Sequence, residues 1–176
     1  MTSRRSTTVA LACVVGVAAL AGSCSRGSRG PAISAPSTIR LTSGVLVDGH
    51  LPVQYSCRGD KSPWPLEVTG VPGDARELAV VVEDPDAPRG TFTHWVVYGV
   101  APTVRHVDIG TVPAGATTGK EYVAPCPPGD DSHHYEVSVY ALREPSGLPA
   151  GRGPADVREA IRGITVAQGR LVALFP

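Results

Sequence analysis

The chain has 176 residues, of which 42% are apolar, and it carries 16 basic and 16 acidic side chains. This length suits one domain with a full core, or one domain with an appendage. The neutral balance and the absence of a basic stripe argue against nucleic acid as a partner. With 17 prolines and 20 glycines, the composition favours a loop-rich, mostly β fold over a helical bundle.

The first 23 residues have the pattern of an export signal. Arg4 and Arg5 precede an uncharged apolar run over residues 8–21, which is shorter than the about 20 residues of a membrane-spanning helix. The run ends in Leu20-Ala21-Gly22-Ser23-Cys24, which resembles a bacterial lipobox, although Ala21 stands where Leu is usual. We therefore expect a lipoprotein signal peptide over 1–23, a lipid on Cys24 and a place in the bacterial envelope, on the outer face of the cytoplasmic membrane.

Simple secretion and an uncleaved anchor are the alternatives to lipidation, and the sequence leaves the Sec and twin-arginine export routes open. The four cysteines support lipidation. Cleavage before Cys24 removes Cys13, and a lipid on Cys24 leaves Cys57 and Cys126 to pair in an oxidising compartment. Residues 24–37 are rich in Ser, Gly, Arg and Pro, which predicts a flexible tether before a domain over 38–176.

The domain shows several short apolar segments and one amphipathic helix. We expect a β-hairpin around Asp48-Gly49 with arms at 45–47 and 51–55, because Asp-Gly is a favoured two-residue turn. Pro154 opens the only well-formed helical pattern, which Gly163 ends. The other predicted strands are 39–41, 66–68, 77–82, 94–100, one near Val107, 133–142 and 171–175, with the rest of 101–121 in loops.

The loop after the strand at 77–82 carries the first candidate site. It reads Asp84-Pro85-Asp86-Ala87-Pro88, and its prolines end the strand because they cannot donate ladder hydrogen bonds. His94 opens the next strand. If the two strands lie side by side, two carboxylates and an imidazole meet at one edge of a sheet. The alternative is that Asp and Pro only build a turn here.

A second proline-rich loop, Tyr122 to Gly129, leads into the strand at 133–142. Side chains alternate between the two faces of a strand. His133 and Tyr135 therefore share a face with an apolar series and should open toward the core. His134 shares the other face with polar residues and should face water.

These two loops together resemble the phosphatidylethanolamine-binding protein family, and most closely its bacterial Raf-kinase-inhibitor-like branch. The similarity is carried by Asp84 to Pro88, His94-Trp95, Pro125 to Gly129 and His133-His134-Tyr135, with support from residues 55–66. Ala124, His134 and Trp64 depart from the family pattern without touching the expected pocket. The resemblance implies a β-sandwich-like fold with a small anion pocket and, often, cis prolines in its loops. The implied pocket residues are Asp84, Asp86, His94, His133 and Tyr135, with Pro88, Pro127 and Pro128 at the rim.

The expected function is an envelope-anchored, non-catalytic binding protein for phosphate, a phosphoester head group or a carboxylate. Asp84 and Asp86 should orient the histidines and raise their pKa, which would favour anions at mildly acid pH. No cofactor or metal is expected. One alternative is an inhibitor of an envelope or secreted hydrolase through protein–protein contact. Another is a hydrolytic or metal-dependent enzyme that uses the His/Asp cluster or Cys126, although neither Gly-x-Ser-x-Gly nor His-Glu-x-x-His occurs.

For two of the candidate site residues, the alternative to ligand binding is a purely structural role. His94 could be a buried histidine with its hydrogen bonds satisfied, and Tyr135 could be a core side chain with a hydrated hydroxyl.

Overall fold

A computed structural model of the chain describes residues 33, 35–129 and 131–176. The predicted signal peptide, Cys24 and most of the predicted tether lie outside the described residues. The described part has nine strands, one α-helix and one 3₁₀ turn: β1 (Ser37–Thr38), β2 (Arg40–Thr42), η1 (Val53–Tyr55), β3 (Trp64–Thr69), β4 (Glu77–Asp84), β5 (Phe92–Val100), β6 (His106–Ile109), β7 (Thr117–Lys120), β8 (His133–Leu142), α1 (Pro154–Ala160) and β9 (Thr165–Phe175). The fold is therefore mostly β, as the composition predicts.

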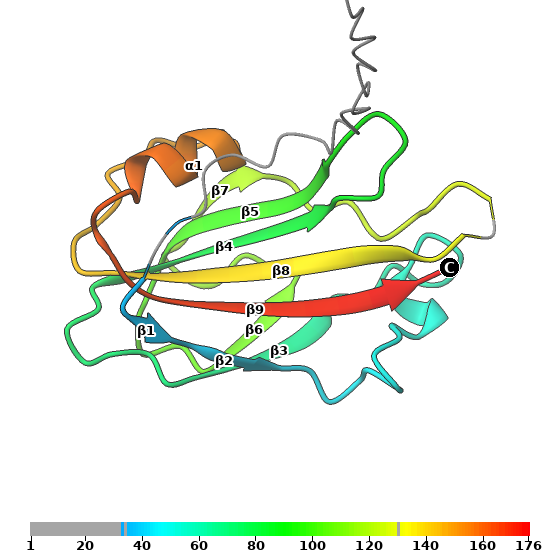
Figure 1. Cartoon of the computed structure of the whole chain (residues 1–176), viewed down its shortest axis with the longest axis horizontal. Coiled ribbons are helices and arrows are strands. Elements are labelled where there is room, and N and C mark those ends of the chain that lie inside the picture. Colours follow the sequence, from blue (N-terminus) through cyan, green and yellow to red (C-terminus); the bar gives the residue numbers. More distant parts are fainter. Residues whose placement is uncertain (1–32, 34, 130) are drawn as a thin grey trace, which may run out of the picture.

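The strands form two sheets that pack face to face. The larger sheet has the order β1-β9-β8-β4-β5-β7, and the smaller one has the order β2-β3-β6 (Figure 1). The pairing is antiparallel throughout except between β1 and β9, which run parallel. This is the β-sandwich architecture that the family resemblance implies.

The main hydrophobic core fills the space between the sheets. Trp64, Leu66 and Val68 of β3 face Val80 and Val82 of β4 across it, and all five are at most 2% exposed. A second, smaller core lies on the other face of the large sheet, where the short helix α1 covers the central strands (Figure 1). The molecule thus has three layers, and the large sheet is buried on both faces at its centre.

The helix α1 is short and owes its place to packing. Its start has Pro154 at the first helical position, where the missing N–H costs nothing. Val157 and Ile161 are fully buried against the large sheet, and Arg158 forms an ion pair with Glu83 at the end of β4. The helix ends at Ala160, two residues before the end that the sequence predicts.

The central strands follow the sequence pattern closely. Strand β4 ends at Asp84, immediately before Pro85, and β8 spans 133–142. On β8, His133 and Tyr135 are buried on the core side, while His134 is exposed. Alternation places Tyr140 on the same face as His134, which was predicted to face water, but Tyr140 is only 8% exposed because α1 and its core cover this end of the strand.

Other expectations were wrong in part. The Asp48-Gly49 turn forms with positive φ at both residues, but the segment 51–55 is not a strand: it contains η1, and Val47 and His50 make only an isolated bridge. Strand β7 arises in a segment expected to be loop, and β9 begins at Thr165 instead of Leu171. The described peptide bonds are all trans, so the cis prolines implied by the resemblance do not occur there.

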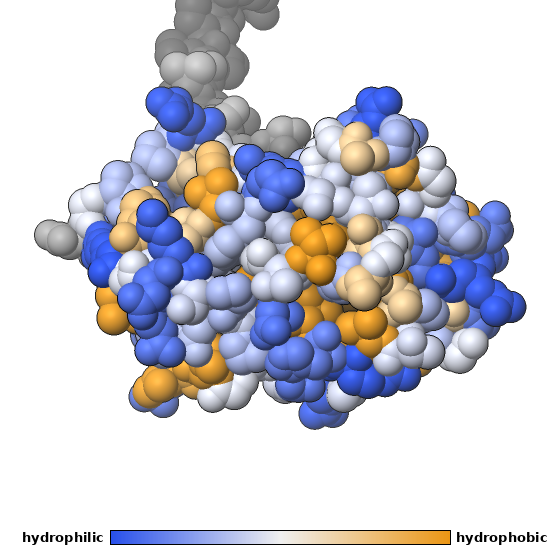
Figure 2. All heavy atoms as spheres, turned by 180° about the vertical axis from the view of Figure 1, so that it is seen from behind, coloured by the Kyte–Doolittle hydropathy of each residue, from blue (hydrophilic) through white to orange (hydrophobic). Residues whose placement is uncertain are grey.

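The described surface shows no extended apolar region from the rear. Seen from behind, hydrophobic residues lie in separate groups among hydrophilic ones (Figure 2). None of the described helices is long and apolar enough to cross a membrane.

Candidate functional site

Both proline-rich loops lie at one end of the large sheet. Because β4 pairs antiparallel with β5 and with β8, the end of β4 lies beside the starts of both neighbours. Asp84 pairs with Phe92 across the first ladder, and His133 pairs with Phe175 at the far end of β9. Figure 1 shows the two loops and the C-terminus gathered at this end. Asp84 and His133, which are 49 positions apart in sequence, therefore meet at this end of the sheet.

A cavity of about 380 Å³ opens between these loops. This volume lies at the small end of the usual range for ligand pockets, roughly 300–1,000 Å³. Its wall combines a few polar groups with a larger apolar surface. The lining residues are Asp84, Ala87, Pro88, Arg89, Gly90, Phe92, His94, Val123, Ala124, Cys126, Pro128 and His133.

A buried histidine–aspartate pair forms one side of the cavity. The Nδ1 atom of His133 lies 2.7 Å from Oδ2 of Asp84, and the two side chains are 7% and 5% exposed. The other carboxylate oxygen of Asp84 accepts a hydrogen bond from the backbone N–H of Asp86, at 2.8 Å. Both oxygens of Asp84 are thus engaged, and an Nδ1–H on His133 leaves Nε2 as the ring's remaining polar atom.

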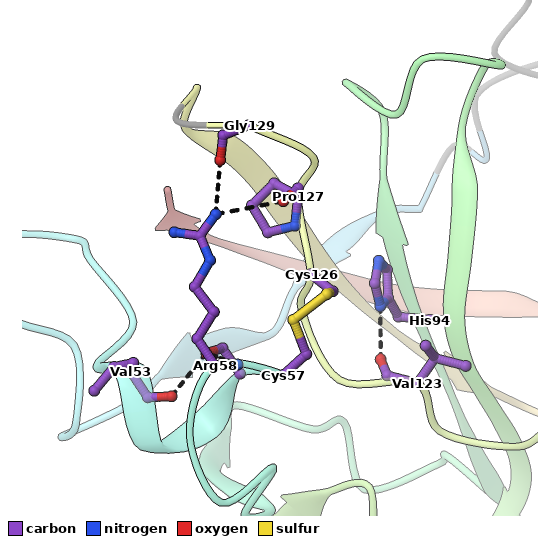
Figure 3. Close-up of a disulfide and its surroundings, with 9 residues drawn as sticks. Val53, Cys57, Arg58, His94, Val123, Cys126, Pro127 and Gly129 are labelled. Atoms are coloured by element: carbon purple, nitrogen blue, oxygen red, sulfur yellow. Dashed lines mark hydrogen bonds between the residues drawn. A yellow bond between two sulfur atoms is a disulfide. The ribbon is translucent and has the colours of Figure 1, made fainter.

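The second imidazole, His94, is held by the other loop. Its Nδ1 donates to the backbone oxygen of Val123 at 2.6 Å, and its second ring nitrogen points away from Val123 (Figure 3). Burial lowers the pKa of His94 below its ordinary value, and it outweighs the hydrogen bond to Val123 and the charge of Asp84, which act upward. The charge of Asp84 acts in the expected direction, but the expectation of a net raised pKa for His94 was wrong, because desolvation of the charged imidazole dominates.

Aromatic rings fix the orientation of His94. Its ring packs edge-to-face against Phe92, with centroids 4.8 Å apart, and against Tyr135, with centroids 5.1 Å apart. Tyr135 is fully buried beneath the cavity and is not among the lining residues. Burial raises the pKa of Tyr135 well above its ordinary value, and the negative charge of Asp84 adds to the effect. Tyr135 therefore supports the histidine as a neutral phenol.

Asp86 turns out of the cavity and binds the second histidine of β8. Its Oδ2 accepts from both the backbone N–H and Nδ1 of His134, each at 2.7 Å. Partial burial raises the pKa of Asp86, but the hydrogen bonds and charge of His134 outweigh burial, so the net pKa is lowered. This pair ties the β4–β5 loop to the start of β8 from the solvent side.

A disulfide between Cys57 and Cys126 joins the cavity wall to the segment after η1 (Figure 3). The predicted partners are thus linked, with their Cα atoms 5.3 Å apart. Arg58, the next residue, donates to the backbone oxygen of Gly129 at 2.7 Å, and Cys57 N–H donates to Pro125 O at 2.9 Å. The disulfide and these hydrogen bonds hold the second loop in place on its outer side.

The structure brings together five of the residues that the sequence nominated for the pocket and its rim, and separates three. The five that line the cavity are Asp84, Pro88, His94, Pro128 and His133. Asp86, Pro127 and Tyr135 do not line it: Asp86 faces His134, Tyr135 lies below His94, and the oxygen of Pro127 faces Arg58.

Arg89 and Phe92 line the cavity but were not nominated. Arg89 directly follows Pro88 in the loop already selected. Phe92 lies two residues before His94 on β5, so the period-two rule places both on one face of the strand. That alternation was the available signal for Phe92.

The part of the chain that the structure describes contains no group of side chains arranged to bind a metal ion. No three His, Cys, Asp or Glu side chains are grouped there as ligands of a metal ion. Cys126 is bonded to Cys57 and cannot act as a thiolate nucleophile in this state.

Comparison with known proteins gives the same family as the sequence motifs. The sequence pattern of the family described as phosphatidylethanolamine-binding protein matches residues 42–176. The chain belongs to the phosphatidylethanolamine-binding protein family. Both proline-rich loops described above lie within the matched residues.

Several relatives cover most of this domain. A UPF0098 protein of Methanothermobacter thermautotrophicus is 35% identical over 138 residues, which are 72% of this chain and 91% of that protein. A Mycobacterium tuberculosis protein that carries the name lipoprotein LppC is 38% identical over 149 residues, covering 80% of this chain and 74% of that one.

The solved structures of family members have the same fold. The homolog CT736 from Chlamydia trachomatis matches with a TM-score of 0.73 and 32% identity, over 80% of this chain and 98% of that chain. YbcL from E. coli, described as a member of the mammalian PEBP family, matches with a TM-score of 0.69 and 25% identity, over 79% and 98%.

Proposed function

We propose that the cavity binds a small anion, such as phosphate, a phosphoester head group or a carboxylate. The observation that carries this proposal is the pair of histidines that line one cavity, each held at Nδ1. Val123 O engages His94, and the Asp84 carboxylate engages His133. Each ring is thereby left with Nε2 as the atom that can meet a ligand. Proteins usually fix an imidazole in this way when its other nitrogen has a task.

Charge determines when such a site accepts an anion. A neutral imidazole with its proton on Nδ1 offers only a lone pair at Nε2, which attracts no anion. Binding therefore requires a proton between Nε2 and the ligand, carried either by the ring or by a hydrogen phosphate. Burial lowers the pKa of His94, which disfavours the charged form of this ring in the free protein. Anion affinity should thus increase as the pH falls.

The carboxylate of Asp84 does not preclude an anion. Its two oxygens accept hydrogen bonds from Asp86 N–H and from His133 Nδ1, and it is only 4% exposed. Arg89, at the rim, contributes a cation that does not titrate in this range. The rigid proline-containing loop over 84–88 fixes the geometry before binding, which lowers the ordering cost.

Calorimetry of the protein with sodium phosphate between pH 5 and pH 8 tests the proposal. We expect binding that tightens toward pH 5, and a loss of at least ten-fold in affinity for His133→Ala. His134→Ala is the matched control, because its neighbouring imidazole lies outside the cavity and should change the affinity less than two-fold. The absence of heat at every pH, or equal affinities for the two variants, would contradict the proposal.

We also propose that the site does not catalyse a reaction. Its described lining residues include no Ser, Thr or Lys, and its one cysteine is in a disulfide. The rival is a hydrolase that uses the Asp84–His133 pair to activate water. Incubation with phosphomonoesters, with release of inorganic phosphate as readout, decides between the two. Turnover that His133→Ala abolishes would establish the enzyme.

Finally, we propose that lipid on Cys24 anchors the domain in the bacterial envelope. The relative that is named lipoprotein LppC and the lipobox-like sequence before Cys24 support this assignment. Metabolic labelling with a radioactive fatty acid should mark the wild-type chain but not Cys24→Ser. Equal labelling of both chains, or of neither, would show that the residue carries no lipid.

A further inference from the structure

The disulfide between Cys57 and Cys126 is open to solvent at one of its two residues. Cys126 is exposed, whereas Cys57 is half-buried. Cys126 is also the one of the two that lines the cavity. Solvent-accessible disulfides are the ones that thiols reduce readily, and access decides which sulfur a thiol attacks. Of the two sulfur atoms, Cys126 Sγ is therefore the one that a thiol reaches in the folded protein.

The position of Cys57 sets the direction of that approach. A thiolate attacks a disulfide sulfur from the side opposite the bond that breaks. Figure 3 shows Cys57 and His94 on opposite sides of Cys126, and His94 shares the cavity wall with Cys126. A thiol that attacks Cys126 thus comes from the cavity. The cavity measures about 380 Å³, which admits a small thiol but not the folded surface of another protein.

Positive charge near the cavity favours the attacking species. The reactive form of a thiol is its thiolate anion. Arg89 lines the cavity, and Lys120 places its ammonium group 5.4 Å from the centroid of the Phe92 ring, which is part of the wall. The Asp84 carboxylate also lines the cavity, but both of its oxygens already accept hydrogen bonds. The charges that remain available to a thiolate are therefore positive.

We propose that Cys126 Sγ is a thiol-exchange site, at which a small thiol that enters the cavity opens the disulfide of the folded protein and thereby loosens the loop over 122–129. The thiolate forms a bond to Cys126 Sγ, the bond between Cys57 and Cys126 breaks, and Cys57 leaves as a thiolate that takes a proton from water. A second thiol attacks the mixed disulfide and releases Cys126. Two small thiols are oxidised to one disulfide, and the protein gains two cysteine thiols. The proposal does not depend on which anion the cavity binds.

The loop should loosen because the disulfide is its covalent link to the segment after η1. Cys57 and Cys126 are 69 positions apart, and their cleavage removes this cross-link. Hydrogen bonds then hold the loop, from Cys57 N–H to Pro125 O and from Val123 N–H to His94 O, each at 2.9 Å. Such bonds open and close locally without global unfolding. The cavity wall would thus respond to the thiols around the protein.

Reduction of the folded full chain by 2-mercaptoethanol at pH 8 tests the site. The chain is first treated with iodoacetamide to block any other thiol, and N-ethylmaleimide traps the products. We expect a rate proportional to the thiol concentration, with the mercaptoethanol adduct on Cys126 and the maleimide on Cys57. A rate that does not depend on thiol concentration would show that the disulfide reacts only after unfolding, and it would overturn the proposal. An adduct on Cys57 instead of Cys126 would do the same.

Arg89→Gln tests the route through the cavity. With 2-mercaptoethanesulfonate, whose thiolate form carries two negative charges, this variant should react about three-fold more slowly than the wild type. Arg105→Gln is the matched control and should react at the wild-type rate. Arg105 does not line the cavity, and its guanidinium donates to the backbone oxygens of Pro102 and Val104. Equal rates for the two variants would refute entry past Arg89.

A protein dithiol is the alternative reductant, and reduced thioredoxin represents it. Because its thiol lies on a folded surface, it should reduce the disulfide more slowly than 2-mercaptoethanol at equal concentration. Faster reduction by thioredoxin would assign the exchange to a protein partner and overturn the small-thiol site.

Amide hydrogen exchange measures the loop. We expect the Val123 N–H to exchange at least ten-fold faster in the reduced chain than in the disulfide-bonded chain. Val137, which is fully buried within β8, is the internal control and should change less than two-fold. Unchanged exchange at Val123 would refute the loosening of the loop.

Discussion

Two histidine–carboxylate pairs lie side by side at the start of β8, one directed into the protein and the other toward solvent. His133 with Asp84 and His134 with Asp86 have the same Nδ1–Oδ2 distance, 2.7 Å. The side chains of the first pair are 7% and 5% exposed, and those of the second are 52% and 40% exposed. The same contact therefore occurs once in the protein interior and once in water.

The difference shows that the solvent exposure of such a pair, more than its contact geometry, determines how much the pair contributes to stability. A buried pair loses hydration on both partners, so removal of one partner leaves a costly unpaired group. An exposed pair exchanges its contact for water at little cost. We thus expect the first pair to matter for stability and for the cavity, and the second to act as a modest clamp on the loop.

The largest effect should come from Asp84→Ala. This change removes the acceptor of two hydrogen bonds and leaves Nδ1–H of His133 buried without a partner. We expect the free energy of unfolding to fall by about 3 kcal/mol. Urea denaturation at pH 7 measures it. A loss below about 1 kcal/mol would show that the buried pair stabilises the protein no more than an exposed pair does.

The second effect is a loss of folding stability at acid pH that depends on His94. Because the pKa of His94 is lowered by burial, the unfolded chain binds more protons than the folded one below about pH 6.5. The stability linked to His94 is therefore complete above its unfolded pKa and decreases as the pH falls toward the folded pKa. His94→Gln should lose less stability than the wild type between pH 7.5 and pH 5. Parallel denaturation curves at both pH values make the comparison, and identical pH dependence would contradict it.

A smaller effect is expected for Asp86→Ala. The pair is largely solvated, so the loss at pH 7 should stay within about 1 kcal/mol and shrink in 1 M salt. The lowered pKa of Asp86 means that this contribution exists above its unfolded value of 3.8 and disappears as the pH falls through the folded pKa. Denaturation at pH 7 and at pH 3 checks both points. A loss as large as that of Asp84→Ala would remove the distinction between the pairs.

The smallest effect is predicted for a third histidine–carboxylate contact, which lies on the small sheet. His106 lies between Glu67 and Asp108 with about half of its side chain exposed. The hydrogen bonds to Glu67 and then Asp108 raise its pKa, so its stabilisation is present below pH 6.5 and is lost above the folded pKa. His106→Gln should change the free energy of unfolding at pH 6 by no more than about 0.5 kcal/mol. A larger change would show that exposed pairs count for more in this fold.

Much of the candidate site was predictable because local rules decide it. Pro85 cannot donate to a ladder, so the strand must end at Asp84 and place the carboxylate at its tip. Alternation along β8 separates His133 from His134 without any knowledge of the partners. The same rule would have selected Phe92, two residues before His94.

Other features depended on contacts that are distant in sequence. Strand β7 contains Gly119 between polar residues and has no apolar alternation, and it forms because it pairs with β5. The segment before α1 also packs closely on it, since a Cβ on Gly119 would lie 2.3 Å from the backbone oxygen of Arg152. The segment 51–55 alternates like a strand, yet Leu51 N–H donates to Leu174 O of β9 and the chain then turns into η1. The lowered pKa of His94 has the same origin, since only the assembled loops bury this side chain.

The sequence alone determined the mostly β class, the bounds of β8 with His133 on its buried face, and the end of β4 before Pro85. These follow from rules that act within a few residues: alternation, and proline's missing donor. Only the tertiary structure decided that Asp86 leaves the cavity for His134, that Tyr135 packs against His94 without lining the cavity, and that Val123 does line it. The reason is that burial and charge at a point depend on every segment that packs there, and no single stretch of the chain contains them all.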